Sequence, residues 1–292
     1  MLLPVLLVIA VVLTLTDAFA HDLTKLPLGD NLKSDAPKVG WLWPCRVEPE
    51  AGGAQVLGPW IKPDATFDKT AKPIVPGNAR WKRQMTMALI GGEREFIFNA
   101  LPDHGTGDFP IKPGTAAYAY DTNPNSIREK NLIIRLPARP ELLPQPMCAP
   151  GAIGILLSGA VLFSGLDAPG RDAVAHEIQD GCDGHPQPSG IYHYHNLSAC
   201  AEGAAKKEEH SPLAGYAIDG FGIYGRHGEG GKKLTNSNLD VCHGHSHEIV
   251  WDGTATSMYH YHATDEFPYV AGCLRGKFTR GNVEILAGPP PR

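Results

Sequence analysis

The chain has 292 residues, of which 20% are charged, and its formal net charge is -5 with no block of lysine or arginine. This length allows one large domain or two small ones, and the acidic balance argues against nucleic acid or an anionic membrane surface as a partner. Glycine and proline make up about a fifth of the chain, which favours many short strands joined by turns.

Residues 1–20 have the composition of a signal peptide. The stretch 2–15 is nearly all apolar, and residues 18–20 read Ala-Phe-Ala, an A-x-A cleavage signature. An uncleaved membrane anchor is the alternative, because the apolar run approaches the length of a spanning helix. We expect cleavage, a mature chain without a membrane span, and a secreted or periplasmic/extracellular location.

Residues 21–90 are rich in proline and are expected to be irregular. Trp41, Trp43 and Trp60 indicate that this segment packs onto the rest of the protein. Strands are expected at 85–90 and 95–100, joined by Gly91-Gly92, and again at 131–136. The main domain is expected to span 91–285.

Two stretches, 151–200 and 213–273, carry the same features in the same order. Each has an apolar hairpin around a Ser-Gly or Asp-Gly turn, then an Asp-x-Cys-x-Gly-His run, then Tyr-His-Tyr-His, then a cysteine. Near-equal spacing predicts two divergent pseudo-repeats that complete one core together. The predicted fold is mainly β, a sandwich or barrel-like domain with long loops and disulfides.

The six cysteines favour disulfides in an exported protein. Sequence alone leaves 15 connectivities open. The symmetry of the two stretches proposes one of them: Cys182 with Cys200, Cys242 with Cys273, and Cys45 with Cys148.

The phrase Tyr-His-Tyr-His occurs at 192–195 and at 259–262. Side chains alternate faces along a strand, so both histidines of a phrase should leave one face and both tyrosines the other. Neutral imidazoles bind divalent transition metals, with zinc or copper favoured and iron a further option. We expect one shared metal centre, and its expected ligands are His193, His195, His260, His262, His185 and His245. The alternative is that these histidines are only hydrogen-bonded core residues, as we expect for the tyrosines.

Supporting roles are assigned to Asp180, Asp240, Asp219, His104 and His243. Asp180 and Asp240 either orient a ligand histidine or form Asx-turns. Asp219 is most simply a turn residue. The runs starting at His176-Glu177 and His247-Glu248 resemble a zincin helix but lack its second histidine, so a zincin protease is not expected.

The chain resembles the YHYH-domain family over about 95–275. The motifs that carry the resemblance are Leu-Pro-Asp-His at 101–104, Gly-Ile-Leu-Leu-Ser-Gly at 154–159, the two Asp-x-Cys runs, and 216–225. Ser158 and Gly222 depart from the pattern expected there. The resemblance implies an exported domain and does not assign a reaction.

These observations favour an exported protein with a histidine-rich metal-binding centre. One alternative is a metal-dependent enzyme, a hydrolase or an oxidoreductase, that uses the same centre with an open coordination position. The other alternative is a structural or surface-interaction domain without metal. The only binding partner that we predict from the sequence is the metal ion.

Overall fold

A computed structural model describes residues 22–46, 52–204, 208–278 and 283–285. The predicted signal peptide at 1–20 lies outside these residues. None of the helices in the described ranges is long and apolar enough to cross a membrane.

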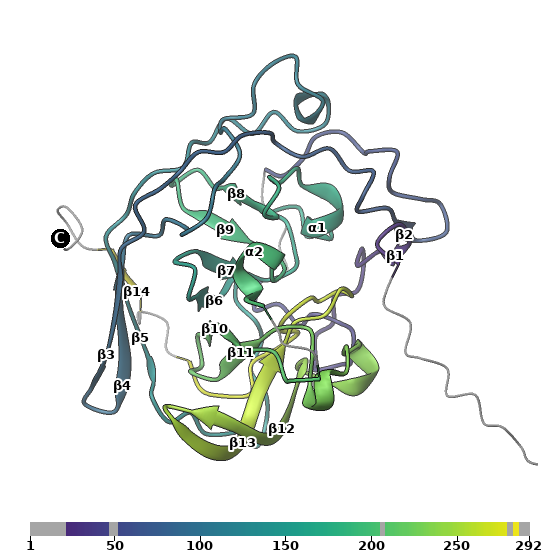
Figure 1. Ribbon diagram of the computed structural model, residues 1–292. Coiled ribbons are helices and arrows are strands. Elements are labelled where there is room, and N and C mark those ends of the chain that lie inside the picture. Colours follow the sequence, from purple (N-terminus) through teal and green to yellow (C-terminus); the bar gives the residue numbers. More distant parts are fainter. Residues whose placement is uncertain (1–21, 47–51, 205–207, 279–282, 286–292) are drawn as a thin grey trace, which may run out of the picture.

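The protein is built on one large sheet and one smaller sheet (Figure 1). The large sheet has eight strands in the order β12-β13-β11-β10-β6-β7-β9-β8. Their bounds are β6 Ala152–Leu156, β7 Val161–Phe163, β8 Gly184–Pro186, β9 Tyr192–Tyr194, β10 Leu213–Ala217, β11 Gly222–Tyr224, β12 Gly244–Trp251 and β13 Thr254–His262. The antiparallel pair β6 and β10 forms its centre.

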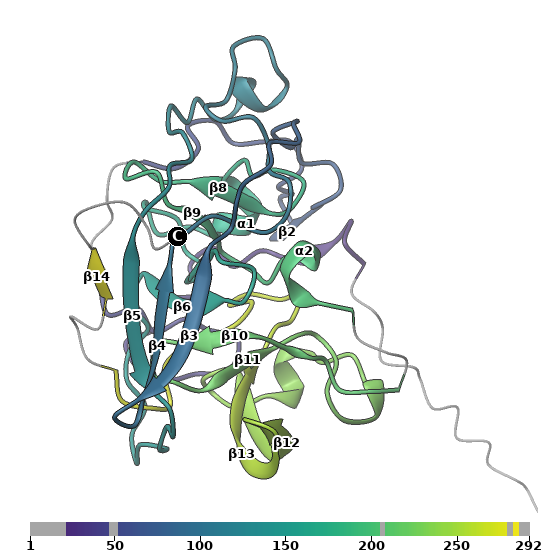
Figure 2. The same cartoon turned by 60° about the vertical axis from the view of Figure 1, so that its left-hand side comes forward.

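The smaller sheet has four strands in the order β14-β5-β4-β3. They are β3 Met85–Ile90, β4 Glu93–Phe98, β5 Leu132–Pro137 and β14 Val283–Ile285. Figure 2 shows this sheet in front of the large one. Phe96 and Ile134 of the smaller sheet pack with Ile155, Tyr216 and other apolar residues of the large sheet. The two sheets therefore enclose a core between their facing sides.

Short elements complete the fold. Strands β1 (Leu26–Pro27) and β2 (Thr66–Phe67) form a separate pair, and the α-helices are α1 (Ala173–His176) and α2 (Ala199–Glu202). Single-turn 3-10 helices span Ala117–Ala119, Glu229–Gly231 and Asn236–Asn238. The mainly β prediction is confirmed. The barrel-like alternative does not apply, because the large sheet and the smaller sheet are both open at their edges.

A second core lies on the other face of the large sheet. It joins Tyr192, Tyr194, Tyr259 and Tyr261 to apolar residues of the N-terminal segment, including Trp60. The Trp60 indole nitrogen donates to the Ala175 carbonyl at 2.8 Å. The irregular N-terminal segment thus covers a sheet face that would otherwise be exposed.

The predicted hairpins are present, but each loop has four residues rather than two: 157–160 between β6 and β7, and 218–221 between β10 and β11. In the β6–β7 turn Gly159 has a φ of 96°, and in the β10–β11 turn Gly220 has a φ of 93°. A Cβ at either glycine would lie 2.5 Å from a backbone oxygen, of Leu101 or of Pro137. Both turns therefore need glycine for conformation and for space.

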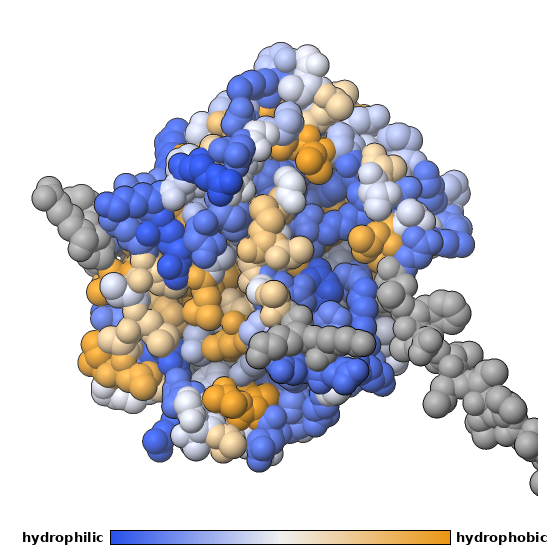
Figure 3. All heavy atoms as spheres, in the orientation of Figure 1, coloured by the Kyte–Doolittle hydropathy of each residue, from blue (hydrophilic) through white to orange (hydrophobic). Residues whose placement is uncertain are grey.

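The strand β3 forms one edge of the smaller sheet and leaves apolar side chains in solvent. Met87, Leu89 and Ile90 are about half exposed. They belong to the apolar surface at the lower left of Figure 3.

All three disulfides join the cysteines that the sequence symmetry paired. They are Cys45–Cys148, Cys182–Cys200 and Cys242–Cys273. The described chain has no free cysteine. Any metal ligands among the described residues are therefore nitrogen or oxygen atoms rather than thiolates.

Candidate metal centres

The two Tyr-His-Tyr-His phrases lie on β9 and β13, and their side chains alternate as the period predicts. The four tyrosines enter the core on one face of the large sheet. The histidines leave the opposite face, since His193 is in register with Val161, whose side chain belongs to the core between the sheets.

The strand order separates the two phrases. Four strands, β11, β10, β6 and β7, lie between β13 and β9. Five strand spacings of about 4.8 Å place the phrases roughly 24 Å apart. The single shared centre expected from the sequence is therefore wrong, because the histidines form two groups at opposite ends of the sheet.

The first group, which we call cluster A, contains His185, His193 and His195. His185 of β8 and His193 of β9 are cross-strand partners. The residue that completes the group is Glu177, which directly follows α1. One of its oxygens, Oε2, lies 3.0 Å from Nε2 of His185 and 3.1 Å from Nε2 of His195. All four side chains are buried.

The charges of cluster A are tightly coupled. Burial opposes ionisation of Glu177, but His185 and His195 outweigh it and hold the pKa of Glu177 well below its usual range. Burial likewise opposes protonation of His185, and the Glu177 carboxylate outweighs it and raises the pKa of His185. Burial and the two neighbouring histidines hold the pKa of His193 well below its ordinary value. Cluster A thus holds a carboxylate and at least one neutral imidazole at neutral pH.

Cluster A opens into a cavity of about 570 Å³. Glu177 and all three histidines line it, with Phe163 stacked on His193 at a ring-centroid distance of 4.2 Å. The remaining wall combines glycine, proline and small apolar residues with polar side chains, which include Lys33, Arg46, Gln55, Asp121, Asn123, Asn125 and Gln187. An ion held by cluster A would be accessible to a small polar molecule.

Helix α1 is fixed at both ends, and this fixes Glu177. The Asp172 carboxylate caps its start by accepting from the amides of Val174 and Ala175. At its end the buried Lys72 ammonium donates to the carbonyls of Val174 at 2.6 Å and Glu177 at 2.7 Å. Lys72 comes from the N-terminal segment, so that segment helps to position cluster A.

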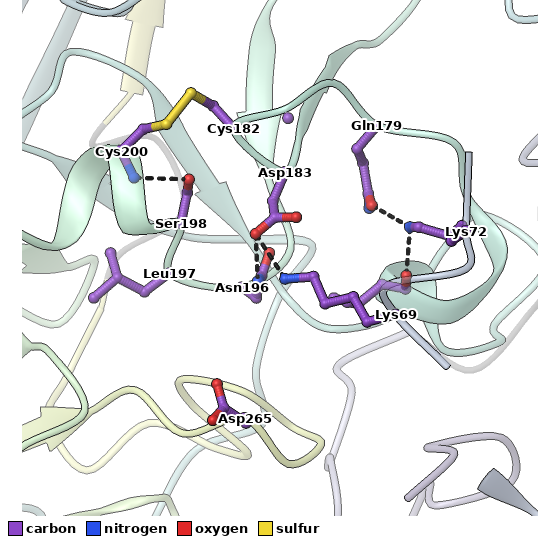
Figure 4. A network of polar contacts seen from close by, with 12 residues as sticks. Lys69, Lys72, Gln179, Cys182, Asp183, Asn196, Leu197, Ser198, Cys200 and Asp265 are labelled. Atoms are coloured by element: carbon purple, nitrogen blue, oxygen red, sulfur yellow. Dashed lines mark hydrogen bonds and ion pairs between the residues drawn. A yellow bond between two sulfur atoms is a disulfide. The ribbon is translucent and has the colours of Figure 1, made fainter. Parts of the chain in front are cut away.

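A polar network beside Lys72 ties the same segment to the strand-connecting loops (Figure 4). The Lys69 ammonium lies 2.8 Å from Asp183, whose carboxylate also accepts from the Asn196 amide at 3.2 Å. Asn196 directly follows the first phrase and is buried. It begins the glycosylation sequon Asn-Leu-Ser at 196–198, and its position in the interior is incompatible with a glycan there in the folded protein.

The second group, cluster B, contains His210, His245, His247, His260 and His262. Four of them come from the neighbouring strands β12 and β13, where His245 and His260 are cross-strand partners. His210 precedes β10 and brings its Nε2 atom to 3.0 Å from Nε2 of His262. His260 and His262 are fully buried, whereas the other three are partly exposed.

Burial lowers the pKa of several rings in cluster B. Burial and the neighbouring imidazoles lower the pKa of His260 to about 3 and of His245 to about 4. Burial also lowers the pKa values of His262 and His210. These rings are neutral at pH 7, which is the form that binds metals.

The predicted supporting residues lie elsewhere. Asp180 accepts from the Tyr192 hydroxyl at 3.0 Å, and Asp240 accepts from that of Tyr259 at 2.9 Å. Both also accept from backbone amides of the following turn, at Cys182 and at Cys242. Of the two roles expected for these aspartates, the geometry is that of the Asx-turn.

Three further predicted residues have polar partners of their own. Asp219 accepts from the Tyr261 hydroxyl at 2.6 Å. His104 contacts the Tyr194 hydroxyl through Nε2. His243 pairs with the His262 carbonyl at 2.8 Å and with the Asn236 side-chain oxygen at 2.8 Å. His104 also lies near Cys182 and Cys200. These two cysteines form a disulfide, so they cannot bind a metal as thiolates.

Sequence reasoning missed Glu177, His210 and His247. Glu177 and His247 belong to the two runs that resemble a zincin helix. Neither run forms a zincin motif, but Glu177 is part of cluster A and His247 is part of cluster B. His247 also continues the alternation His243-x-His245-x-His247, a signal that a strand reading could have used. His210 has no local signal, because only the fold brings it to His262.

The model of the YHYH protein family matches residues 134–233, which is about a third of the chain. No curated protein and no solved structure matches the chain. The matched range contains all four residues of cluster A and only His210 of cluster B. The resemblance carried by the sequence motifs is confirmed over residues 134–233, where the chain matches the YHYH protein family model.

Proposed function

We propose that this protein is exported and binds a divalent transition metal ion at cluster A through His185, His193, His195 and Glu177. The observation that carries the proposal is the convergence of one carboxylate oxygen and two imidazole Nε2 atoms within about 3 Å, with a third imidazole beside them. Neither Glu177 Oε2 nor the ring nitrogens of His185 have a well-aligned hydrogen-bond partner among the described residues. Buried polar atoms of this kind need a partner.

The donor set narrows the class of metal. Three imidazoles and a carboxylate suit zinc and iron, and copper also binds such nitrogen and oxygen ligands. The His195 ring is oriented by a contact of 2.6 Å from its Nδ1 to the Ser164 carbonyl, which leaves Nε2 as the ligand atom.

Export is proposed from the predicted signal peptide and from the disulfides. Three disulfides in one chain are typical of oxidising compartments. We also propose that 151–200 and 213–273 are divergent pseudo-repeats. Support comes from matching pairings: β6 with β7 and β10 with β11 antiparallel, β7 with β9 and β11 with β13 parallel.

Metal analysis of the purified, oxidised protein tests the proposal. After removal of bound metal and reloading with zinc, copper or iron, we expect cluster A to hold one equivalent. His193→Ala should lose that equivalent, and Glu177→Gln should weaken binding if the carboxylate is a ligand. Replacement of His227, which lies outside both clusters, should leave the binding unchanged. Failure of every metal to bind at cluster A would refute this proposal.

The cavity favours a second function for the same centre, that of a metal-dependent enzyme. In that case the metal keeps an open position, and Glu177 acts as a base beside it rather than as a ligand. Cobalt-substituted protein distinguishes the two. A change of its visible spectrum on addition of azide, with metal retained in Glu177→Gln, supports an enzyme. A spectrum that azide leaves unchanged supports a closed binding site.

A further inference from the structure

We propose that cluster B is a second, independent metal centre that binds copper(II) through imidazole nitrogens alone. It uses residues other than those of cluster A and lies roughly 24 Å away along the sheet, by the strand spacing. The two proposals can therefore fail separately.

The first observation is the contact between His210 and His262. The Nδ1 atom of His262 lies 2.6 Å from the Gly225 carbonyl, and that of His210 lies 2.7 Å from the Ser211 carbonyl. A carbonyl only accepts, so each Nδ1 must carry the proton. In the neutral rings neither Nε2 atom then carries a proton, so each presents a lone pair. The two Nε2 atoms nevertheless face each other at 3.0 Å. Two acceptors at this distance need a cation between them or beside them.

Two of the other rings of cluster B, those of His260 and His247, are oriented in the same way. Nδ1 of His260 lies 3.1 Å from the Met258 carbonyl, and Nδ1 of His247 lies 2.9 Å from the Glu248 carbonyl. Commitment of one ring nitrogen to a carbonyl is the usual arrangement of a metal-bound histidine.

Three of the remaining nitrogens have no partner. The Nε2 atoms of His245, His247 and His260 are buried and make no hydrogen bond within the described part of the chain. One ring nitrogen from each of the five residues lies within 4.8 Å of the others. Nitrogens bound at about 2.0 Å to a square-planar copper(II) ion lie roughly 2.8 Å apart in cis and roughly 4.0 Å apart in trans. The cluster is thus already close to the size of a coordination sphere.

The sequence forms this arrangement through two His-x-His pairs on neighbouring strands. His245 and His247 leave one face of β12, and His260 and His262 leave the same face of β13. The β12–β13 pairing places His245 opposite His260. Tyr224 of β11 packs edge-on against His260 at a centroid distance of 5.0 Å and closes the inner side.

The donor set selects the metal class. Cluster B contains no carboxylate and no thiolate, and Glu229, 3.7 Å from Nδ1 of His247, is an exposed acid outside it. Among divalent ions, imidazole sites bind copper most tightly in the Irving–Williams order. The partly exposed His210, His245 and His247 give an ion a route from solvent.

Copper(II) titration of the full-length protein, followed by electron paramagnetic resonance, tests the proposal. The background is His193→Ala, which removes cluster A. We expect one copper equivalent with a nitrogen-only signal. His260→Ala should lower the affinity by at least tenfold to a hundredfold. Because His260 is buried and its loss can unfold the protein, His210→Ala and His247→Ala at partly exposed positions serve as second variants, with His227→Ala as the matched control.

The proposal is overturned if copper affinity stays the same in His210→Ala and His247→Ala. It is equally overturned if copper binds without nitrogen coupling, or not at all, which would mean that His210 and His262 share a proton instead. If the His193→Ala background itself bound no copper while the wild type did, the ion would belong to cluster A. That result would contradict a second centre.

Discussion

At the scale of single residues, three of the tyrosine hydroxyls on the face opposite the histidines donate to carboxylates. The Tyr261 hydroxyl donates to Asp219 and accepts from the Arg275 amide at 2.8 Å. Tyr261→Phe leaves both groups without this partner, and we expect a loss of about 1–3 kcal/mol in the free energy of unfolding. Denaturant titration of the metal-free protein measures it.

Tyr224 supplies the matched control for that substitution. Its hydroxyl is buried without a hydrogen-bond partner among the described residues. Tyr224→Phe should therefore leave the unfolding free energy unchanged or raise it. An equal loss in both variants would contradict the role given to the Tyr261 bond.

Asp172 makes stability depend on pH. Burial raises its pKa to about 6 from the ordinary value of 3.8, although the Tyr269 hydroxyl opposes the rise. Between these two pH values the Asp172 carboxyl group is therefore protonated in the folded protein and ionised in the unfolded chain. The contribution of this proton to stability is fully present below about pH 4 and is lost as pH rises through 6.

Asp172→Asn should remove this pH dependence, because the amide stays neutral. Relative to the wild type, the variant should gain up to about 3 kcal/mol between pH 4 and pH 7. Asp64 is an exposed acid whose pKa is lowered by the Thr66 hydroxyl, so Asp64→Asn should show no such gain. Parallel pH profiles of the wild type and Asp172→Asn would refute the assignment.

At the scale of elements, the four-residue helix α1 connects the N-terminal segment to cluster A. Lys72→Met removes the ammonium that holds the carbonyls of Val174 and Glu177. We expect metal affinity at cluster A to fall about tenfold to a hundredfold, with copper binding at cluster B unchanged. Lys62→Met is the control, since Lys62 is exposed and its ammonium donates to the nearby Pro59 carbonyl. Equal affinities in the two variants would show that Lys72 does not position Glu177.

Strand identity and side-chain direction could be predicted because they depend on local sequence. The alternation in 192–195 and 259–262 correctly assigned tyrosines and histidines to opposite faces. The position of β9 and β13 in the sheet could not be predicted, because it depends on long-range pairing of β6 with β10. The same limit hid Glu177 and His210, which reach their clusters only through the fold.

At the scale of the whole molecule, two separate centres predict additive stabilisation by metal. An ion at one hundred times its dissociation constant stabilises the folded state by about 2.7 kcal/mol. Sites this far apart should act independently, so the fully loaded wild type should gain the sum of the gains of His193→Ala and His260→Ala. Unfolding with and without metal measures all three. A wild-type gain no larger than that of one variant would contradict two sites.

The edge position of the β12–β13 hairpin has a consequence for related proteins. The segment 134–233 carries every side chain of cluster A, whereas four of the five histidines of cluster B lie on the hairpin beyond it. A protein that shared only this segment would inherit the first centre without the second. Relatives can therefore contain cluster A without cluster B. Two His-x-His pairs after the shared segment would indicate that a relative also has cluster B.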